Sequence, residues 1–235
     1  MHQLFAALKT APDGAVFNPW FDVDPDYDQS KKCPAIRRAQ LRQCLAERWM
    51  HPARCLLIAE AIGYQGGHFT GMAMTSERLL LGELEAKGLC PGHVFLGLEP
   101  RRTSNPASPK LKNVIQAKGF NEPTATVVWG WIVDSGFDTR DFILWNAFAW
   151  HPFHANKGML SNRTPNDDEL QQGRHALITL LELSRKHCGD ELRIVAIGKK
   201  SAELLSALDV SAPSVRHPAN GGVPEFRRQM NELLR

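Results

Sequence analysis

Three polar residues stand at or just beyond the ends of short apolar runs, where they are placed to bind a ligand. Glu60 follows the run 55–59, while Asn146 and His217 each close a later run. The amide of Asn146 can donate and accept hydrogen bonds at once, and an imidazole can donate to an oxygen on which negative charge develops. A carboxylate, an amide and an imidazole together could recognise a polar ligand through hydrogen bonds and polarise it.

The apolar runs have the length of β-strands, and they alternate with segments of helical periodicity. Strands are predicted at Arg54–Ala59, Asp141–Asn146, Arg193–Gly198 and Ser214–His217. Helices are predicted at Pro34–Met50, Thr75–Gly88, Thr124–Ser135, Thr164–His187, Lys199–Leu208 and Pro224–Arg235. Capping favours these bounds, since Thr75 or Ser76 is a plausible N-cap and Thr164 precedes a proline.

This alternation predicts an α/β fold with a central, mostly parallel four-stranded sheet and helices on both faces. The chain of 235 residues is expected to form a single domain, 1–235, whose first 30 or so residues are an extension. Ligands of such sheets bind beyond the carboxyl ends of the strands. We therefore expect Glu60, Asn146 and His217 to border one crevice, beside a loop rich in glycine.

Composition sets limits on the function. The net charge of +3 is small, but the segment 101–119 carries five basic residues and no acidic one, as either a solvated loop or a contact for DNA phosphate. The five cysteines contain no C-x-x-C pair, so free thiols are expected, with no metal or other cofactor. No membrane span or secretory signal is apparent, which favours a cytoplasmic protein.

Four stretches in chain order resemble the motifs of the uracil-DNA glycosylase superfamily. They are Ala59–Gly71, which is similar to motif A; Leu144–Phe148, around the base-reading asparagine; Asn162–Pro165; and Arg216–Gly222, which is similar to motif B. The resemblance implies a monomeric enzyme that hydrolyses the N-glycosidic bond of deoxyuridine in single- or double-stranded DNA. Uracil and an abasic site would be its products.

The resemblance also implies roles for single residues. Phe69 would stack on a base flipped out of the DNA, Asn146 would donate to uracil O4 and accept from N3–H, and His217 would donate to O2 as the base leaves. Contacts with DNA are expected from the motif B loop, with Val223 as a candidate wedge, and from a second loop. The residues concerned are Arg216, Asn220, Gly221, Gly222 and His154.

The sequence departs from the superfamily pattern at two places. Ala61 stands where the family aspartate orients the attacking water, so Glu60, Gln65 or main-chain carbonyls are left to hold it. Gly63 stands where the family tyrosine excludes thymine, and the neighbouring Tyr64 is a candidate for that task. Two alternatives therefore stay open: a glycosylase for another deaminated base such as hypoxanthine, and a protein that binds uracil or abasic DNA without cutting.

Overall fold

A parallel sheet lies at the centre of the chain in a computed structural model that describes residues 1–234. Its four strands run in the order β3 (Phe142–Phe148), β2 (Cys55–Ala61), β5 (Arg193–Ile197) and β6 (Ser214–Val215), and every neighbouring pair is parallel. Because both faces are covered, β3 is buried along its whole length. The predicted fold class is confirmed.

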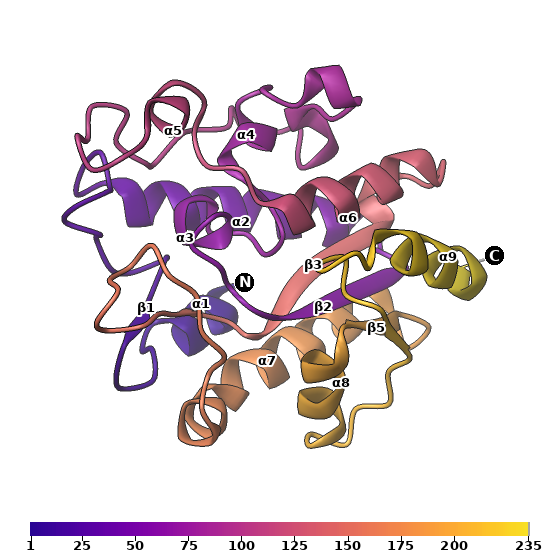
Figure 1. Ribbon diagram of the computed structural model, residues 1–235. Coiled ribbons are helices and arrows are strands. Elements are labelled where there is room, and N and C mark those ends of the chain that lie inside the picture. The colour runs from indigo at the N-terminus through magenta and orange to yellow at the C-terminus, as the bar shows by residue number, and fades with distance from the viewer. Residues whose placement is uncertain (235) are drawn as a thin grey trace.

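Helices cover both faces of this sheet (Figure 1). On one face lie α2 (Cys33–Met50) and α6 (Pro123–Asp134), and on the other lie α7 (Asp167–Cys188) and α8 (Lys199–Ser206). The last helix, α9 (Val223–Leu234), packs beside β6. No helix within residues 1–234 combines the length and the apolar character needed to cross a membrane.

The N-terminal residues are part of the packed fold. Helix α1 (His2–Leu8) packs against α7, and the short strand β1 (Val16–Phe17) pairs antiparallel with β4 (His151–Pro152). Trp20 stacks on Trp145 of the central sheet, with ring centroids 6.0 Å apart. Both rings are buried, so this segment adds to the hydrophobic core.

The predicted helix Thr75–Gly88 is shorter than the sequence indicated. Helix α4 covers only Glu77–Leu80, and Ser76 caps it by accepting a hydrogen bond from the Leu79 amide at 3.4 Å. Gly82 then adopts a positive φ of 78°, which ends the helical path. The other short elements are α3 (Gly67–Thr70), η1 (Glu85–Lys87), η2 (Pro91–His93), α5 (Asn113–Lys118) and η3 (Thr139–Asp141).

Helix α7 also begins later than predicted. Asn166, and not Thr164, is its N-cap: the Asn166 side chain accepts from the Glu169 amide, and Glu169 accepts in return from the Asn166 amide, both at 2.9 Å. This reciprocal pair is a capping box, which satisfies two amides at the helix start. Glu169 additionally forms an ion pair with Arg163, which fixes the loop before α7.

The basic segment 101–119 is largely bound to the protein itself. Arg102 donates to the carbonyls of Ile115 and Gln116, at 2.6 and 2.7 Å. Lys110 forms an ion pair with Asp26, and Lys118 forms another with Glu83. Two of the five basic side chains are thus in ion pairs and a third is held by carbonyls, which favours the loop interpretation over a dedicated phosphate contact.

Candidate functional site

A pocket of about 430 Å³ opens at the carboxyl edge of the sheet, where the crevice was predicted. It gathers residues from the ends of β2 and β3, from the loops around α3 and α6, and from the segments that precede α7 and α9. They are Ala59, Glu60, Ala61, Ile62, Gly63, Met74, Glu122, Thr124, Asn146, Asn162, Arg163, Thr164 and His217. Five residues predicted for the reaction or the base therefore meet here: Glu60, Ala61, Gly63, Asn146 and His217.

Asn146 lines the pocket from the face of the sheet that α2 and α6 cover. Leu144, two residues earlier on β3, borders a small internal void together with Leu45 of α2 and Trp129 of α6. Alternate residues of a strand point to the same face, so Asn146 projects on that face too. Its Oδ1 atom is buried without a hydrogen-bond partner among the described residues. A buried acceptor in this state requires a donor from a ligand or from water.

His217 presents a defined tautomer. Its Nδ1 atom accepts a hydrogen bond from the Ala219 amide at 3.1 Å, so a neutral ring carries its proton on Nε2. Burial lowers the pKa of His217 below its usual value, although the nearby Glu60 carboxylate opposes that shift. A neutral imidazole with a fixed Nε2–H is suited to donating a hydrogen bond at neutral pH.

Of the two side chains predicted to hold water, only Glu60 lines the pocket. Its Oε1 atom is buried and unpartnered among the described residues. Gln65 instead lines a neighbouring pocket of about 500 Å³, together with Tyr64. Tyr64 packs edge-on against Phe120 there, and Gly63 alone of this trio borders the main pocket. The expectations that Gln65 holds the attacking water and that Tyr64 meets the base do not match this arrangement.

Phe69 does not reach the pocket, which corrects its predicted stacking role. Its ring is fully buried in a separate cluster with Leu111 and stacks on Phe120, with centroids 4.3 Å apart. Met74 lines the pocket instead; it has a positive φ of 46°, and its own carbonyl accepts from Trp129 Nε1 at 3.0 Å. The α3 helix turns the chain inward at Phe69, so the residue that reaches the site comes five positions later.

The residues predicted to contact DNA lie in the His217 loop and, for His154, in a second loop. Arg216, Asn220 and Gly221 are exposed, and the last two adopt positive φ values of 52° and 74°. Gly222 is buried, and a Cβ there would lie only 2.0 Å from the His217 carbonyl oxygen. Gly222 therefore permits the tight turn that holds His217. The half-buried His154 donates its amide to Ser161 Oγ at 3.0 Å.

Two of the histidines near the site form a buried hydrogen-bonded chain. His151 Nε2 donates to the Ser161 carbonyl at 2.9 Å, which leaves its Nδ1 to accept from His68 Nδ1 at 2.9 Å. His68 Nε2 lies 3.0 Å from Asp24, whose pKa burial raises, so the carboxyl is able to carry the shared proton. Within residues 1–234 no group of three or more His, Cys, Asp or Glu side chains has the arrangement of a metal site.

Acid is expected to destabilise the protein through His151. Burial lowers the pKa of His151 to about 3 in the folded chain, against about 6.5 when unfolded. Below pH 6.5 His151 becomes protonated in the unfolded chain but stays neutral in the folded chain. The free energy of unfolding therefore has its full value above that pH and decreases toward pH 3. Between pH 7.5 and pH 5, protonation of this group should lower the free energy of unfolding by about 2 kcal/mol, as measured by urea unfolding.

A His151→Gln variant tests the assignment, because it removes the titrating group. Its free energy of unfolding should fall less than that of the wild type between the two pH values. His175→Ala, an exposed position on α7, is the matched control and should keep the wild-type slope. Equal slopes for wild type and His151→Gln would contradict the prediction.

Several pocket residues were not assigned roles from the sequence. They are Met74, Glu122 and Thr124, together with Asn162, whose Oδ1 accepts from the Tyr64 amide at 3.0 Å. Met74 lies three positions beyond Gly71, where the resemblance to motif A ends, so no motif marked it. Nothing in the local sequence distinguished Glu122 from a solvated residue before a helix.

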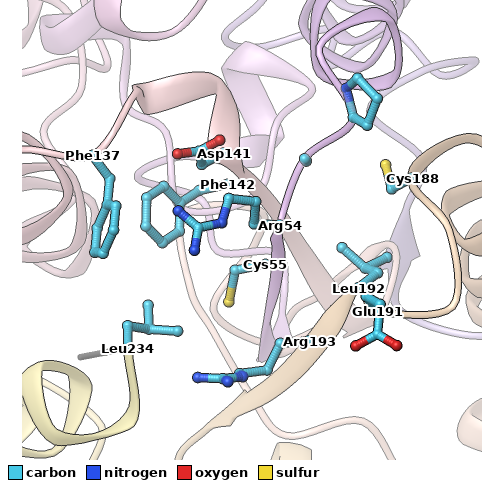
Figure 2. Close-up of a pocket in the computed structure, with 12 residues that line it drawn as sticks. Arg54, Cys55, Phe137, Asp141, Phe142, Cys188, Glu191, Leu192, Arg193 and Leu234 are labelled. Atoms are coloured by element: carbon cyan, nitrogen blue, oxygen red, sulfur yellow. The ribbon is translucent and has the colours of Figure 1, made fainter.

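A second pocket, of about 370 Å³, lies at the opposite edge of the sheet. Figure 2 shows Arg54, Cys55 and Arg193 around it, with Phe137 and Phe142 to one side. It borders the amino ends of β2, β3 and β5, since Cys55, Phe142 and Arg193 are their first residues. Ligand sites of open parallel sheets lie at the other edge, so the carboxyl-edge pocket is the candidate site.

Comparisons with known proteins identify a likeness in structure. No family model matches the sequence, and no curated protein matches it either. Among solved structures, the chain is similar to the crystal structure of wild-type SMUG2 from Pedobacter heparinus, with a TM-score of 0.55 and 14% sequence identity. The match covers 96% of this chain and 91% of that chain. This likeness confirms the predicted uracil-DNA glycosylase-like architecture.

Proposed function

We propose that this protein is a DNA glycosylase that excises uracil from DNA and leaves an abasic site. One observation carries the proposal: Asn146, whose amide oxygen has no partner among residues 1–234, and His217, whose neutral ring has its proton on Nε2, border one pocket of about 430 Å³. The fold shared with SMUG2, from the uracil-DNA glycosylase superfamily, supports it. The acting form would be a cytoplasmic monomer, with DNA as its partner.

The pocket's groups suit each step of the hydrolysis. The base leaves the helical stack and enters the pocket, where Asn146 Oδ1 accepts from N3–H and the amide nitrogen donates to O4. The bond between C1′ of the sugar and N1 then breaks, and its electron pair moves onto the base. His217 Nε2–H donates to O2 as the negative charge grows there. Water adds to C1′ and passes a proton to the Glu60 carboxylate, while the uracil anion takes up a proton from solvent. Met74 lies under the ring.

Exposed parts of the His217 loop are suited to the DNA backbone. Arg216 supplies a charge that phosphate attracts, while Asn220 and Gly221 bring the main chain close to the surface. Val223 is half-buried at the start of α9 and is proposed as the wedge that enters the vacated stack.

Alkaline scission of oligonucleotides tests the proposal. Single- and double-stranded DNA with one uracil is incubated with the protein and then treated with alkali, which cuts at abasic sites. Scission at the uracil position supports the proposal. Scission only at hypoxanthine would assign another deaminated base, and binding without scission would identify a non-catalytic binder.

Glu60 is expected to hold the attacking water. Since Ala61 lacks a carboxylate and Gln65 lies in the neighbouring pocket, Glu60→Gln should lower the single-turnover rate at least tenfold, in line with the contribution of a general base. Gln65→Ala is the matched control and should stay within about twofold of wild type. If neither substitution slows excision, the water is held by main-chain carbonyls instead.

A further inference from the structure

The pocket has two chemically different sides. Ala59 of β2 pairs in register with Asn146 of β3, so their side chains project to the same face of the sheet. Glu60, the next residue of β2, projects to the opposite face. His217 lies on that opposite side, where the Glu60 charge acts to raise its pKa. Its Cβ lies 3.1 Å from the position that a Cβ on Gly198 would take. One side therefore joins Glu60 to His217, and the other carries Asn146.

Glu122 belongs to the side that carries Asn146. It is the N-cap residue of α6, the helix that covers this face, and it lines the pocket together with Met74. Its carboxyl lies against the Gly66 backbone, where an added Cβ would fall 1.8 Å from Oε2. The side chain makes no capping hydrogen bond to α6, and its Oε2 atom is buried without a partner among the described residues.

We infer that Glu122 is a second residue that recognises the base. Its protonated carboxyl donates a hydrogen bond to a carbonyl oxygen of the base. That oxygen is next to the ring N–H, which donates its own hydrogen bond to Asn146 Oδ1. This inference rests on the proposed function. A carbonyl oxygen has two lone pairs, so it can accept from both the Asn146 amide and the Glu122 hydroxyl. The ligand class is a base with adjacent C=O and N–H groups, as in uracil and hypoxanthine.

The protonation state of Glu122 makes this role workable at neutral pH. Burial raises its pKa to about 7, and no neighbouring charge contributes to that shift. The other titratable groups on the pocket wall are Glu60 and His217, on the opposite side, and Arg163, which is paired with Glu169. Tyr64 and Arg78 line the adjoining pocket beside Asn121, the residue before Glu122.

The same group would select against cytosine. Where uracil has the O4 acceptor, cytosine has an amino donor, and its ring N3 is an acceptor. The neutral Glu122 hydroxyl, a donor, would then face the amino donor, and the acceptor Asn146 Oδ1 would face the acceptor N3. Both contacts leave buried polar atoms unpaired. Rejection of the normal base would thus be shared by residues from β3 and from the start of α6.

Binding of free uracil measured by calorimetry at pH 6 and pH 8 tests the inference. A group with a pKa of about 7 is roughly nine-tenths protonated at pH 6 and one-tenth at pH 8, so wild-type affinity should fall about tenfold. Glu122→Gln keeps a donor at every pH and should bind with little pH dependence. Glu122→Leu removes the donor and should bind weakly at both values, with circular dichroism confirming the fold.

Other outcomes reject the inference or the function separately. If Glu122→Gln binds as weakly as Glu122→Leu, or keeps the wild-type pH dependence, Glu122 does not read the base. If Glu122→Gln and Glu122→Leu both bind uracil as the wild type does but excise it more slowly, the carboxyl acts on the reaction and not on the base, and the inference is also wrong. A wild type that binds neither uracil nor hypoxanthine at either pH, and cuts neither, overturns the proposed function itself.

Discussion

Replacing His217 with alanine should slow uracil excision by about 100- to 1,000-fold under single-turnover conditions. A preorganised donor aimed at a developing oxyanion contributes about 3–4 kcal/mol in a site shielded from water. The Ala219 amide already fixes the imidazole tautomer, so no reorganisation is needed when the base departs. Rapid-quench measurement on uracil-containing duplex DNA gives the rate.

The pH dependence of the wild type supplies an independent check on His217. The neutral ring is the working form, and its pKa lies below the usual value because of burial. The His217 contribution should therefore be constant above pH 6.5 and be lost only as the pH falls below the lowered pKa. His175→Ala should retain full activity, and a His217→Ala variant of wild-type speed would remove this residue from the mechanism.

Asn146→Ala should reduce excision of uracil by about 10- to 200-fold. A site built to pair with a particular pattern of donors and acceptors loses about 1–3 kcal/mol when one member is deleted. Because Asn146 is buried and its Oδ1 has no other partner, the substitution breaks no hydrogen bond of that atom within the described chain. The melting temperature should therefore change little while the rate falls.

Asn113→Ala is the matched control for Asn146, since this asparagine at the start of α5 is exposed and is not among the residues that line the pocket. It should leave the rate unchanged. Competition with free uracil gives a second readout, because Asn146→Ala should weaken inhibition by the product as well as excision. Unchanged inhibition together with a slower rate would contradict a base-reading role.

The sheet was predictable because its strands are short, apolar and separated by helical patterns. Asn146 and His217 followed from the rule that polar residues beyond the carboxyl ends of parallel strands converge. The bounds of α4 and α7 were less predictable. Gly82 ends α4 early, and the Asn166–Glu169 capping box competes successfully with Thr164 and Pro165.

Two features of the site depend on tertiary structure that no local pattern contains. Phe69 looks from the sequence like a residue beside the ligand, yet α3 turns it into a cluster with Phe120. Glu122 looks like a solvated residue before a helix, yet the glycine at position 66 lets the loop close over its carboxyl. In each case a contact between distant segments decides where the side chain points.

The methionine at position 74 has a consequence for the range of bases that the pocket can hold. A planar aromatic floor would fix the height and tilt of any ring laid upon it. An unbranched thioether adjusts its shape to what lies above it and remains attractive to ring edges and faces alike. With the flexible side chain of Met74 beneath the base, both single-ring and fused-ring bases would be able to pack in the pocket. Selection between them would then depend on the hydrogen-bonding groups that line it.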